Sequence, residues 1–131
     1  MIQAVLGLVV AGAAILGGGP GPRPEAGSYG LPEGSDLTLT YMAKAGFASA
    51  VKLSCDPVGG GHPKGAEACA LLRKIDADPA RLPAGDRMCI LLYQPVTAEL
   101  KGVWQGRDVS WRHTYGNTCE MNRATGVLFQ F

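Results

Sequence analysis

The sequence has few aromatic residues, only two histidines and almost no excess of charge. Its net charge is +1 at pH 7, with acidic and basic residues interspersed, whereas proteins that bind nucleic acid carry a strongly basic surface. The chain also lacks a Gly-x-Ser-x-Gly motif, a His-Glu-x-x-His motif and a phosphate-binding glycine loop. We therefore expect neither a nucleic-acid partner nor an enzyme.

A hydrophobic run long enough to span a membrane is also missing. Residues 4–16 are apolar and uncharged over about 13 residues, which suits a signal peptide but falls short of the roughly 18–20 residues of a membrane span. Because no Lys or Arg precedes this run, a buried helix or a truncated start is the alternative. Residues 17–34 are rich in Gly and Pro, a composition that does not form a core.

These features predict the domain organisation and the location of the protein. We expect residues 1–34 to be a signal peptide with a flexible leader, and residues 35–131 to form one domain. The mature protein is then secreted and extracellular, with no membrane contact after signal cleavage.

Four cysteines lie in the expected domain: Cys55, Cys69, Cys89 and Cys119. An even number in an exported protein predicts two disulfides, for which three pairings exist. Zinc binding is the alternative, but no two cysteines lie two to four residues apart, and the two histidines are far apart. We expect no metal and no cofactor.

Alternating apolar and polar residues predict an antiparallel sheet of about five strands. Residues 37–43 and 47–55 fit one hairpin, and residues 96–101 and 108–115 fit a second, long hairpin with its turn at Gly106-Arg107. A final strand is predicted over residues 126–131, where Val127, Phe129 and Phe131 share one face.

Helical spacing predicts two short helices on one side of this sheet, which makes the fold class α+β. One covers about residues 63–75, with Pro63 in its first turn, and Asp78-Pro79 begins one further turn. The inward face of the first helix is expected to hold Ala66, Cys69, Leu72 and Ile75. Trp104 and Trp111 are expected to pack in the core or on the sheet.

Residues 85–95 contain an apolar run, Met88, Ile90, Leu91 and Leu92, around Cys89. Taken alone, the periodicity and composition of this run favour a buried strand.

The order of several short motifs resembles the Streptomyces subtilisin inhibitor family. The resemblance covers about residues 37–131, and its Gly-Val-Trp-Gln-Gly and Cys-Glu-Met-Asn segments are distinctive. The motifs are Cys55-Asp-Pro, Gly-His62-Pro63, Cys69, Met88-Cys89, Tyr93-Gln-Pro95-Val, Gly102-Val-Trp-Gln-Gly106, Asn117-x-Cys119-Glu-Met-Asn122 and Val127-Leu-Phe-Gln-Phe131.

The resemblance implies a secreted inhibitor that presents the bond between Leu91 and Leu92 to a subtilisin-like serine protease as a substrate would. It implies the disulfides Cys55–Cys69 and Cys89–Cys119, and a homodimer formed through the sheets, for which we expect an exposed apolar face on the long hairpin. Counted from the reactive bond, Leu91 is then the P1 residue and Leu92 is P1′. The protease-contacting positions around them are Met88 (P4), Cys89 (P3), Ile90 (P2), Tyr93 (P2′) and Gln94.

An extended, exposed loop with Leu91 in the S1 pocket suits subtilisin or chymotrypsin, and Met88 in the S4 pocket favours subtilisins. Asn117 is expected to support the loop by hydrogen-bonding its carbonyl groups, the alternative being an ordinary turn residue. Ile90 stands where the family commonly has proline, so we expect somewhat weaker inhibition or slow cleavage. A secreted structural or binding module with no protease target remains the alternative function.

Overall fold

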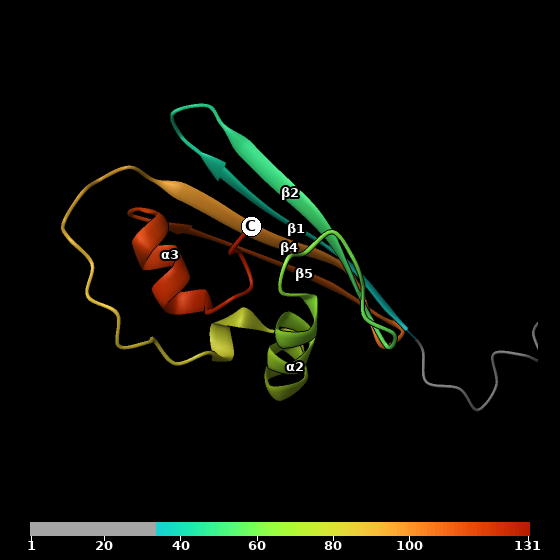
Figure 1. Cartoon of the computed structure of the whole chain (residues 1–131). Coiled ribbons are helices and arrows are strands. Elements are labelled where there is room, and N and C mark those ends of the chain that lie inside the picture. Colours follow the sequence, from blue (N-terminus) through green and yellow to red (C-terminus); the bar gives the residue numbers. More distant parts are fainter. Residues whose placement is uncertain (1–33) are drawn as a thin grey trace, which may run out of the picture. The chain divides into compact units, whose positions relative to one another are not determined.

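The computed structural model describes residues 34–131 (Figure 1), so the expected signal peptide and leader lie outside the described residues, apart from Gly34. The described part is a five-stranded sheet in the order β3-β2-β1-β4-β5, paired antiparallel throughout, with helices on one face. This confirms the predicted α+β class. None of the helices within residues 34–131 is long and apolar enough to cross a membrane.

The central strand β1 (Ser35–Ala43) pairs on one side with β2 (Ala48–Cys55) and on the other with β4 (Val96–Trp104). The predicted alternation is present: Leu37 and Leu39 are fully buried, whereas Thr38 and Thr40 lie on the opposite face. Burying a leucine side chain stabilises a fold by about 1.5–3 kcal/mol. The core therefore forms between this face of the sheet and the helices (Figure 1).

The long hairpin joins β4 to β5 (Arg107–Tyr115), and its turn lies at Gln105-Gly106, one residue before the predicted position. Trp104 is buried, and Trp111 packs against the core while staying partly exposed.

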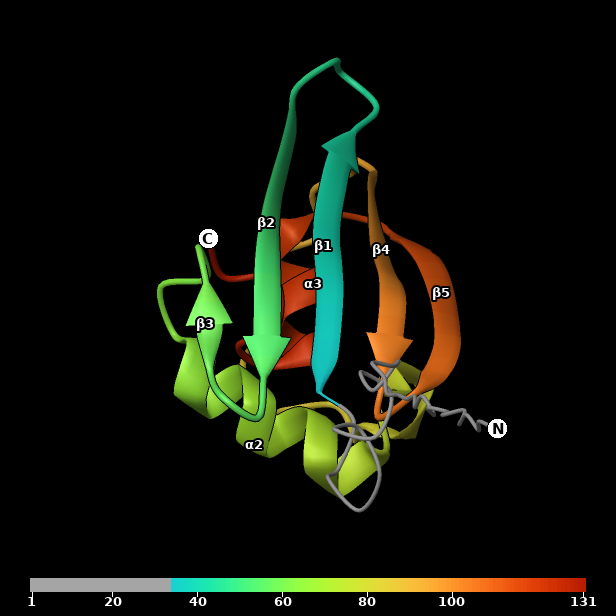
Figure 2. The same cartoon turned by 90° about the vertical axis from the view of Figure 1, so that its right-hand side faces the viewer.

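Figure 2 looks onto the face of the sheet that no helix of the described residues covers. On that face the long hairpin presents mainly polar side chains, such as Thr97, Glu99 and Lys101, with Val103 as the exposed apolar one. The expected exposed apolar face is therefore wrong for this side of the hairpin. Strand alternation explains the difference, because the apolar side chains of β4 point towards the helices.

Helix α2 (Gly65–Ile75) begins two residues later than predicted and buries Cys69, Leu72 and Ile75, with Ala68 in place of Ala66. The disulfide Cys55–Cys69 joins it to the end of β2. The predicted N-cap at Asp78 is confirmed, because its carboxylate accepts a hydrogen bond from the Ala80 N–H at 3.0 Å and begins η1 (Pro79–Arg81).

The predicted C-terminal strand is wrong. The chain instead forms α3 (Thr118–Thr125), and residues 126–131 continue in turns, so the fifth strand is the short β3 (Gly59–Gly60). Leu128 and Phe129 are consecutive and both buried, which a strand with one buried face does not allow. Two hydrogen bonds hold the tail against the rest of the domain. The Tyr41 Oη donates to the Phe131 carbonyl at 2.8 Å, and the His62 Nε2 donates to the Leu128 carbonyl at 2.9 Å.

Candidate functional site

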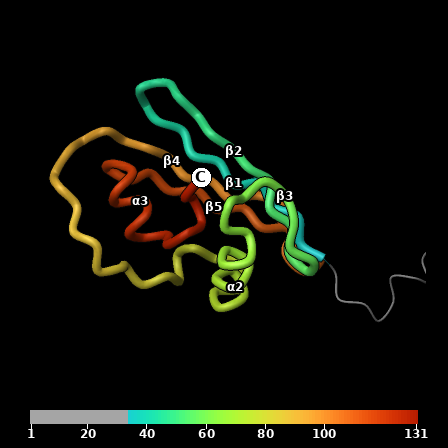
Figure 3. Tube along the Cα trace, viewed as in Figure 1, coloured from blue at the N-terminus to red at the C-terminus, as the bar shows by residue number. Residues whose placement is uncertain are grey.

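The segment between η1 and β4 is a long loop that runs around α3 (Figure 3). Its residues 87–94 have no regular secondary structure. The side chains of Met88, Ile90, Leu91 and Tyr93 are 91%, 74%, 101% and 79% exposed, and Leu92 is 47% exposed. The buried strand that periodicity alone favoured is therefore wrong. So many large apolar side chains exposed together mark a surface that contacts another molecule.

The loop is held at both ends and in the middle by α3 and by Gly116, which precedes that helix. The disulfide Cys89–Cys119 ties it to the first turn of that helix. Backbone hydrogen bonds from the Gly85 N–H to the Arg123 carbonyl and from the Gln94 N–H to the Gly116 carbonyl, both 2.8 Å, fasten the two flanks. The exposed side chains therefore stand on a backbone that is anchored every few residues.

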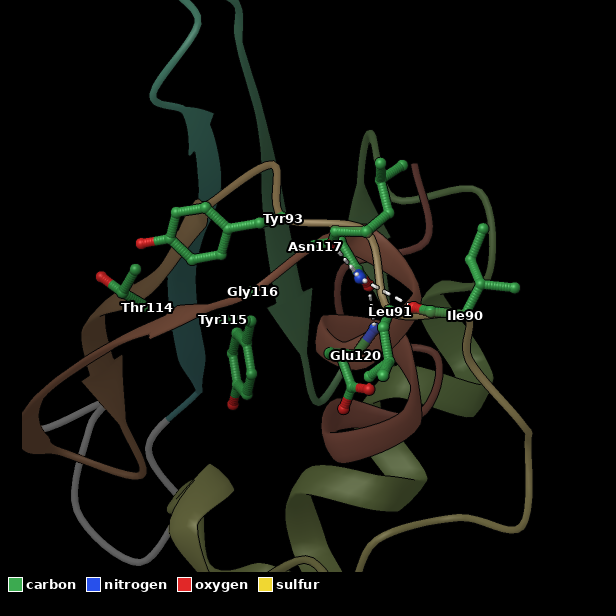
Figure 4. Close-up of a pocket in the computed structure, with 9 residues that line it drawn as sticks. Ile90, Leu91, Tyr93, Thr114, Tyr115, Gly116, Asn117 and Glu120 are labelled. Carbon is green, nitrogen blue, oxygen red and sulfur yellow. Dashed lines mark hydrogen bonds between the residues drawn. The ribbon is translucent and has the colours of Figure 1, made fainter.

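Asn117 connects α3 to the middle of the loop (Figure 4). It is buried and serves as the N-cap of the helix, where its Oδ1 accepts a hydrogen bond from the Glu120 N–H at 2.8 Å. Its Nδ2 donates to the Leu92 carbonyl at 2.7 Å and, at the longer distance of 3.4 Å, to the Ile90 carbonyl. A carboxamide offers both the acceptor for the helix and the donors for the loop, so Asn117 orients the carbonyl groups on either side of Leu91.

The loop backbone is bent at Leu91, where an extended loop was expected. The Leu92 N–H donates to the Ile90 carbonyl at 3.0 Å, which closes a three-residue turn around Leu91. Because Asn117 draws the carbonyl groups of Ile90 and Leu92 towards α3, the Leu91 side chain stands at the apex, fully exposed.

A shallow hollow of about 500 Å³ lies beside this apex, between the loop and the end of β5. Leu91, Tyr93, Tyr115 and Glu120 line it, and Figure 4 shows them around the space. Burial raises the pKa of the Tyr115 phenol, so its neutral form persists to higher pH than usual. Glu120 is paired with Arg123 at 2.6 Å, so the charge of this residue in the lining of the hollow is balanced.

The structure therefore gathers the residues that the sequence singled out: Met88 to Gln94 lie on the loop, and Cys119 and Asn117 lie beneath it. The disulfides are Cys55–Cys69 and Cys89–Cys119, the pairing that the family resemblance implied.

Sequence reasoning missed Tyr115 and Glu120, which line the hollow beside Leu91. For Glu120 a signal existed, since Asn followed by Glu three residues later marks a helix start. Within residues 34–131 no three His, Cys, Asp or Glu side chains gather as a metal site would require.

Comparisons with known proteins agree with this geometry. Residues 33–117 match the family model described as subtilisin inhibitor-like. A subtilase-type protease inhibitor of Streptomyces fradiae is 41% identical over 137 aligned positions, which cover 98% of this chain and 95% of that protein. Subtilisin inhibitor-like protein 1 of Streptomyces cacaoi is 42% identical over 98 residues, covering 72% of this chain and 89% of that protein.

A solved structure is also similar. It is the crystal structure of Streptomyces caespitosus sermetstatin in complex with Bacillus licheniformis subtilisin, which has a TM-score of 0.64 and 29% sequence identity, and covers 76% of this chain and all of the other. A family model matches most of the chain, and two relatives above 40% identity cover 72% and 98% of it, so this protein belongs to the subtilisin inhibitor-like family.

Proposed function

We propose that this protein is a secreted inhibitor of subtilisin-type serine proteases that binds them as a tightly held substrate, with Leu91–Leu92 as the reactive bond. The observation that carries the proposal is a fully exposed Leu91 at the apex of a loop whose neighbouring carbonyl groups are hydrogen-bonded to Asn117. The chain itself supplies no catalytic group in this proposal. It is bound, and it blocks the protease.

Docking places the loop in the protease cleft, where its backbone adds hydrogen bonds and its side chains fill pockets. Leu91 fills S1, which suits the apolar pocket of subtilisin or chymotrypsin, whereas the buried S1 carboxylate of trypsin would be left unpaired. Met88 fills S4 with a flexible apolar side chain. Ile90 and Cys89 lie between them, and Tyr93 and Gln94 follow the bond on the primed side.

Inhibition, as opposed to digestion, requires that the bond be cut slowly and that the cut ends stay together. On one side of the bond, Cys89 remains tied to α3 by its disulfide; on the other, the Leu92 carbonyl is held by Asn117 and the Gln94 N–H by Gly116. Both new ends would thus stay attached to the same helix start. Religation then competes with departure, and little ordering entropy is lost on docking.

The decisive experiment is a titration of a subtilisin with the purified protein. The proposal expects stoichiometric loss of protease activity, and a parallel titration of a chymotrypsin-type protease measures the breadth of the target class. A secreted binding module without a protease target would leave both activities unchanged. That result would defeat the proposal.

Asn117→Ala is expected to turn the inhibitor into a faster substrate. The change removes both loop hydrogen bonds and the helix cap, so we expect a loss of about 1 kcal/mol of stability and a roughly tenfold to hundredfold faster hydrolysis of the Leu91–Leu92 bond. The measurement is a time course of the intact mass in the presence of catalytic protease.

Asn117→Ser is the matched control. Serine can cap α3, but its short side chain does not reach the two loop carbonyl groups. We expect near-normal thermal stability with the same fast hydrolysis as alanine. If the serine variant resists cleavage like the wild type, the loop hydrogen bonds are not what protects the bond.

Ile90→Pro tests the stiffness of the loop. Within residues 34–131 the Ile90 N–H makes no hydrogen bond, so proline removes none and fixes φ. A restriction of the free loop by about 0.4–1 kcal/mol predicts a twofold to fivefold lower inhibition constant and slower cleavage. Progress curves of inhibition against wild type measure both, and equal constants would contradict the role assigned to stiffness.

Secretion and dimerisation complete the proposal. The two disulfides suit an oxidising extracellular compartment. A second copy could cover the exposed sheet face of Figure 2, which carries Thr38, Thr40, Thr97 and Thr114, side chains that offer methyl groups and hydroxyls together. Sedimentation equilibrium tests the assembly, and a monomer mass at every concentration would argue against it.

A further inference from the structure

The turn between β1 and β2 lies against the exit of the reactive loop. The Lys44 N–H donates to the Pro95 carbonyl at 2.9 Å, and the Ala43 N–H donates to the Phe47 carbonyl at 2.8 Å, which closes the turn. Ala43 also stands opposite Val96 in the β1–β4 register. In Figures 1 and 3 the tip of this hairpin and the end of the loop lie at the same end of the sheet.

The Phe47 ring at this turn is 56% exposed although it is among the largest apolar side chains of the domain. Its aromatic neighbour is Tyr41, which it meets edge-on with ring centroids 6.2 Å apart. That contact leaves more than half of the ring in solvent, so the packing of the domain alone does not account for it. Val58, 47% exposed, is a comparable side chain near the opposite end of β2.

A second hollow, of about 360 Å³, lies between this turn and the loop. It is lined by Ala43, Lys44, Phe47, Tyr93, Pro95 and Thr118 among others. Tyr93 also lines the first hollow beside Leu91, so the two hollows are neighbours along the loop, with Tyr93 between them. Pro95 follows Leu92 by three residues, a reach of about 10 Å in extended chain.

We propose that this hollow is a second contact surface for the target protease, on the primed side of the reactive bond, where Phe47 receives an apolar side chain from the rim of the protease cleft. The inference rests on the proposed function. Binding the loop in the cleft brings the hollow to the protease surface, because Tyr93 and Pro95 belong to both. A standard protease–inhibitor interface draws about 20–30 residues from each partner, and the loop from Met88 to Gln94 supplies seven, so neighbouring surfaces are expected to contribute.

The proposal makes Phe47 a residue that sets affinity and selectivity among proteases. The rim beyond the S2′ pocket differs between proteases, whereas the cleft that holds the loop backbone is shared by the class. A contact with the rim therefore changes the inhibition constant by different factors for different proteases. A purely structural role, acting through the shape of the loop, changes it by the same factor for all of them.

The experiment compares Phe47→Ala with Val58→Ala in the full chain, against one subtilisin and one chymotrypsin-type protease. Phe47→Ala is expected to raise the inhibition constant for subtilisin by about threefold to tenfold, chiefly through faster dissociation, and to raise it by a different factor for the second protease. Val58→Ala is expected to leave both constants unchanged. Thermal unfolding of both variants checks that the fold is retained.

Three results would overturn the inference: an unchanged constant for Phe47→Ala, an equal effect of Val58→Ala, or the same factor for both proteases. Failure of the proposed function is distinguishable from all three. In that case the wild type itself does not inhibit, whereas failure of the inference leaves a wild-type inhibitor that depends on Leu91 and not on Phe47.

Discussion

Replacing Leu91 by aspartate is expected to abolish inhibition of subtilisin while leaving the protein folded. The aspartate loses the apolar contact with the S1 pocket and would place an unpaired charge there, and together these effects predict a rise of the inhibition constant of at least about a thousandfold. Since the Leu91 side chain is fully exposed in the free protein, the substitution touches no core contact. Titration of the protease, together with thermal unfolding, measures both consequences.

The controls for Leu91 are chosen at the same position. Leu91→Met keeps an apolar side chain of similar volume and should still inhibit subtilisin, within about tenfold of the wild type. Leu91→Lys supplies the cation that the S1 carboxylate of trypsin pairs with, so it should create inhibition of trypsin. If Leu91→Asp inhibits as well as the wild type, Leu91 is not the P1 residue and the reactive bond lies elsewhere.

Removing the disulfide at the loop, with Cys89→Ser and Cys119→Ser together, is expected to convert the inhibitor into a substrate. The two cysteines are 30 residues apart in sequence, and a bridge closing a chain of that length stabilises a fold by about 3–4 kcal/mol. The same change frees the segment before the reactive bond from α3. We therefore expect rapid cleavage at Leu91–Leu92 and recovery of protease activity with time, both followed by mass spectrometry and residual activity.

The other bridge supplies the matched control for this variant. Cys55→Ser with Cys69→Ser removes a bridge of 14 residues between β2 and α2 and leaves the loop tied to α3. It should lower the unfolding temperature yet still inhibit well below that temperature. Should both double variants be cleaved equally fast under conditions where each is folded, general destabilisation and not the loop tether explains the result.

Much of the sheet was predictable because a half-buried strand leaves a local pattern. Leu37 and Leu39 alternate with Thr38 and Thr40, and the structure buries the first pair and turns the second outward. The N-cap at Asp78 was likewise predictable from the pair Asp78-Pro79. In these places the information lies within a few residues of chain, so periodicity and turn chemistry suffice.

The same reasoning failed at the C-terminus. Val127, Phe129 and Phe131 alternate like a strand, but Phe129 lies close to the Trp111 ring while the Phe131 carbonyl binds Tyr41. These partners come from distant strands and impose turns on the tail. The helix before it left a signal, Asn117 followed by Glu120, that the alternating pattern downstream obscured.

By itself, the sequence determined the class of fold, the strands β1, β2, β4 and β5 in outline, the helix that carries Cys69 and, through its motifs, the family. Its periodicity did not determine whether Met88 to Leu92 is a buried strand or an exposed loop, because an apolar run looks alike in both, and the exposed loop was expected only from the family resemblance. The tertiary structure decided this, through contacts between residues that are distant in the chain: the Cys89–Cys119 bridge and the hydrogen bond from Asn117 to the Leu92 carbonyl. Those contacts hold the segment away from the core, so the Leu91 side chain is exposed to solvent.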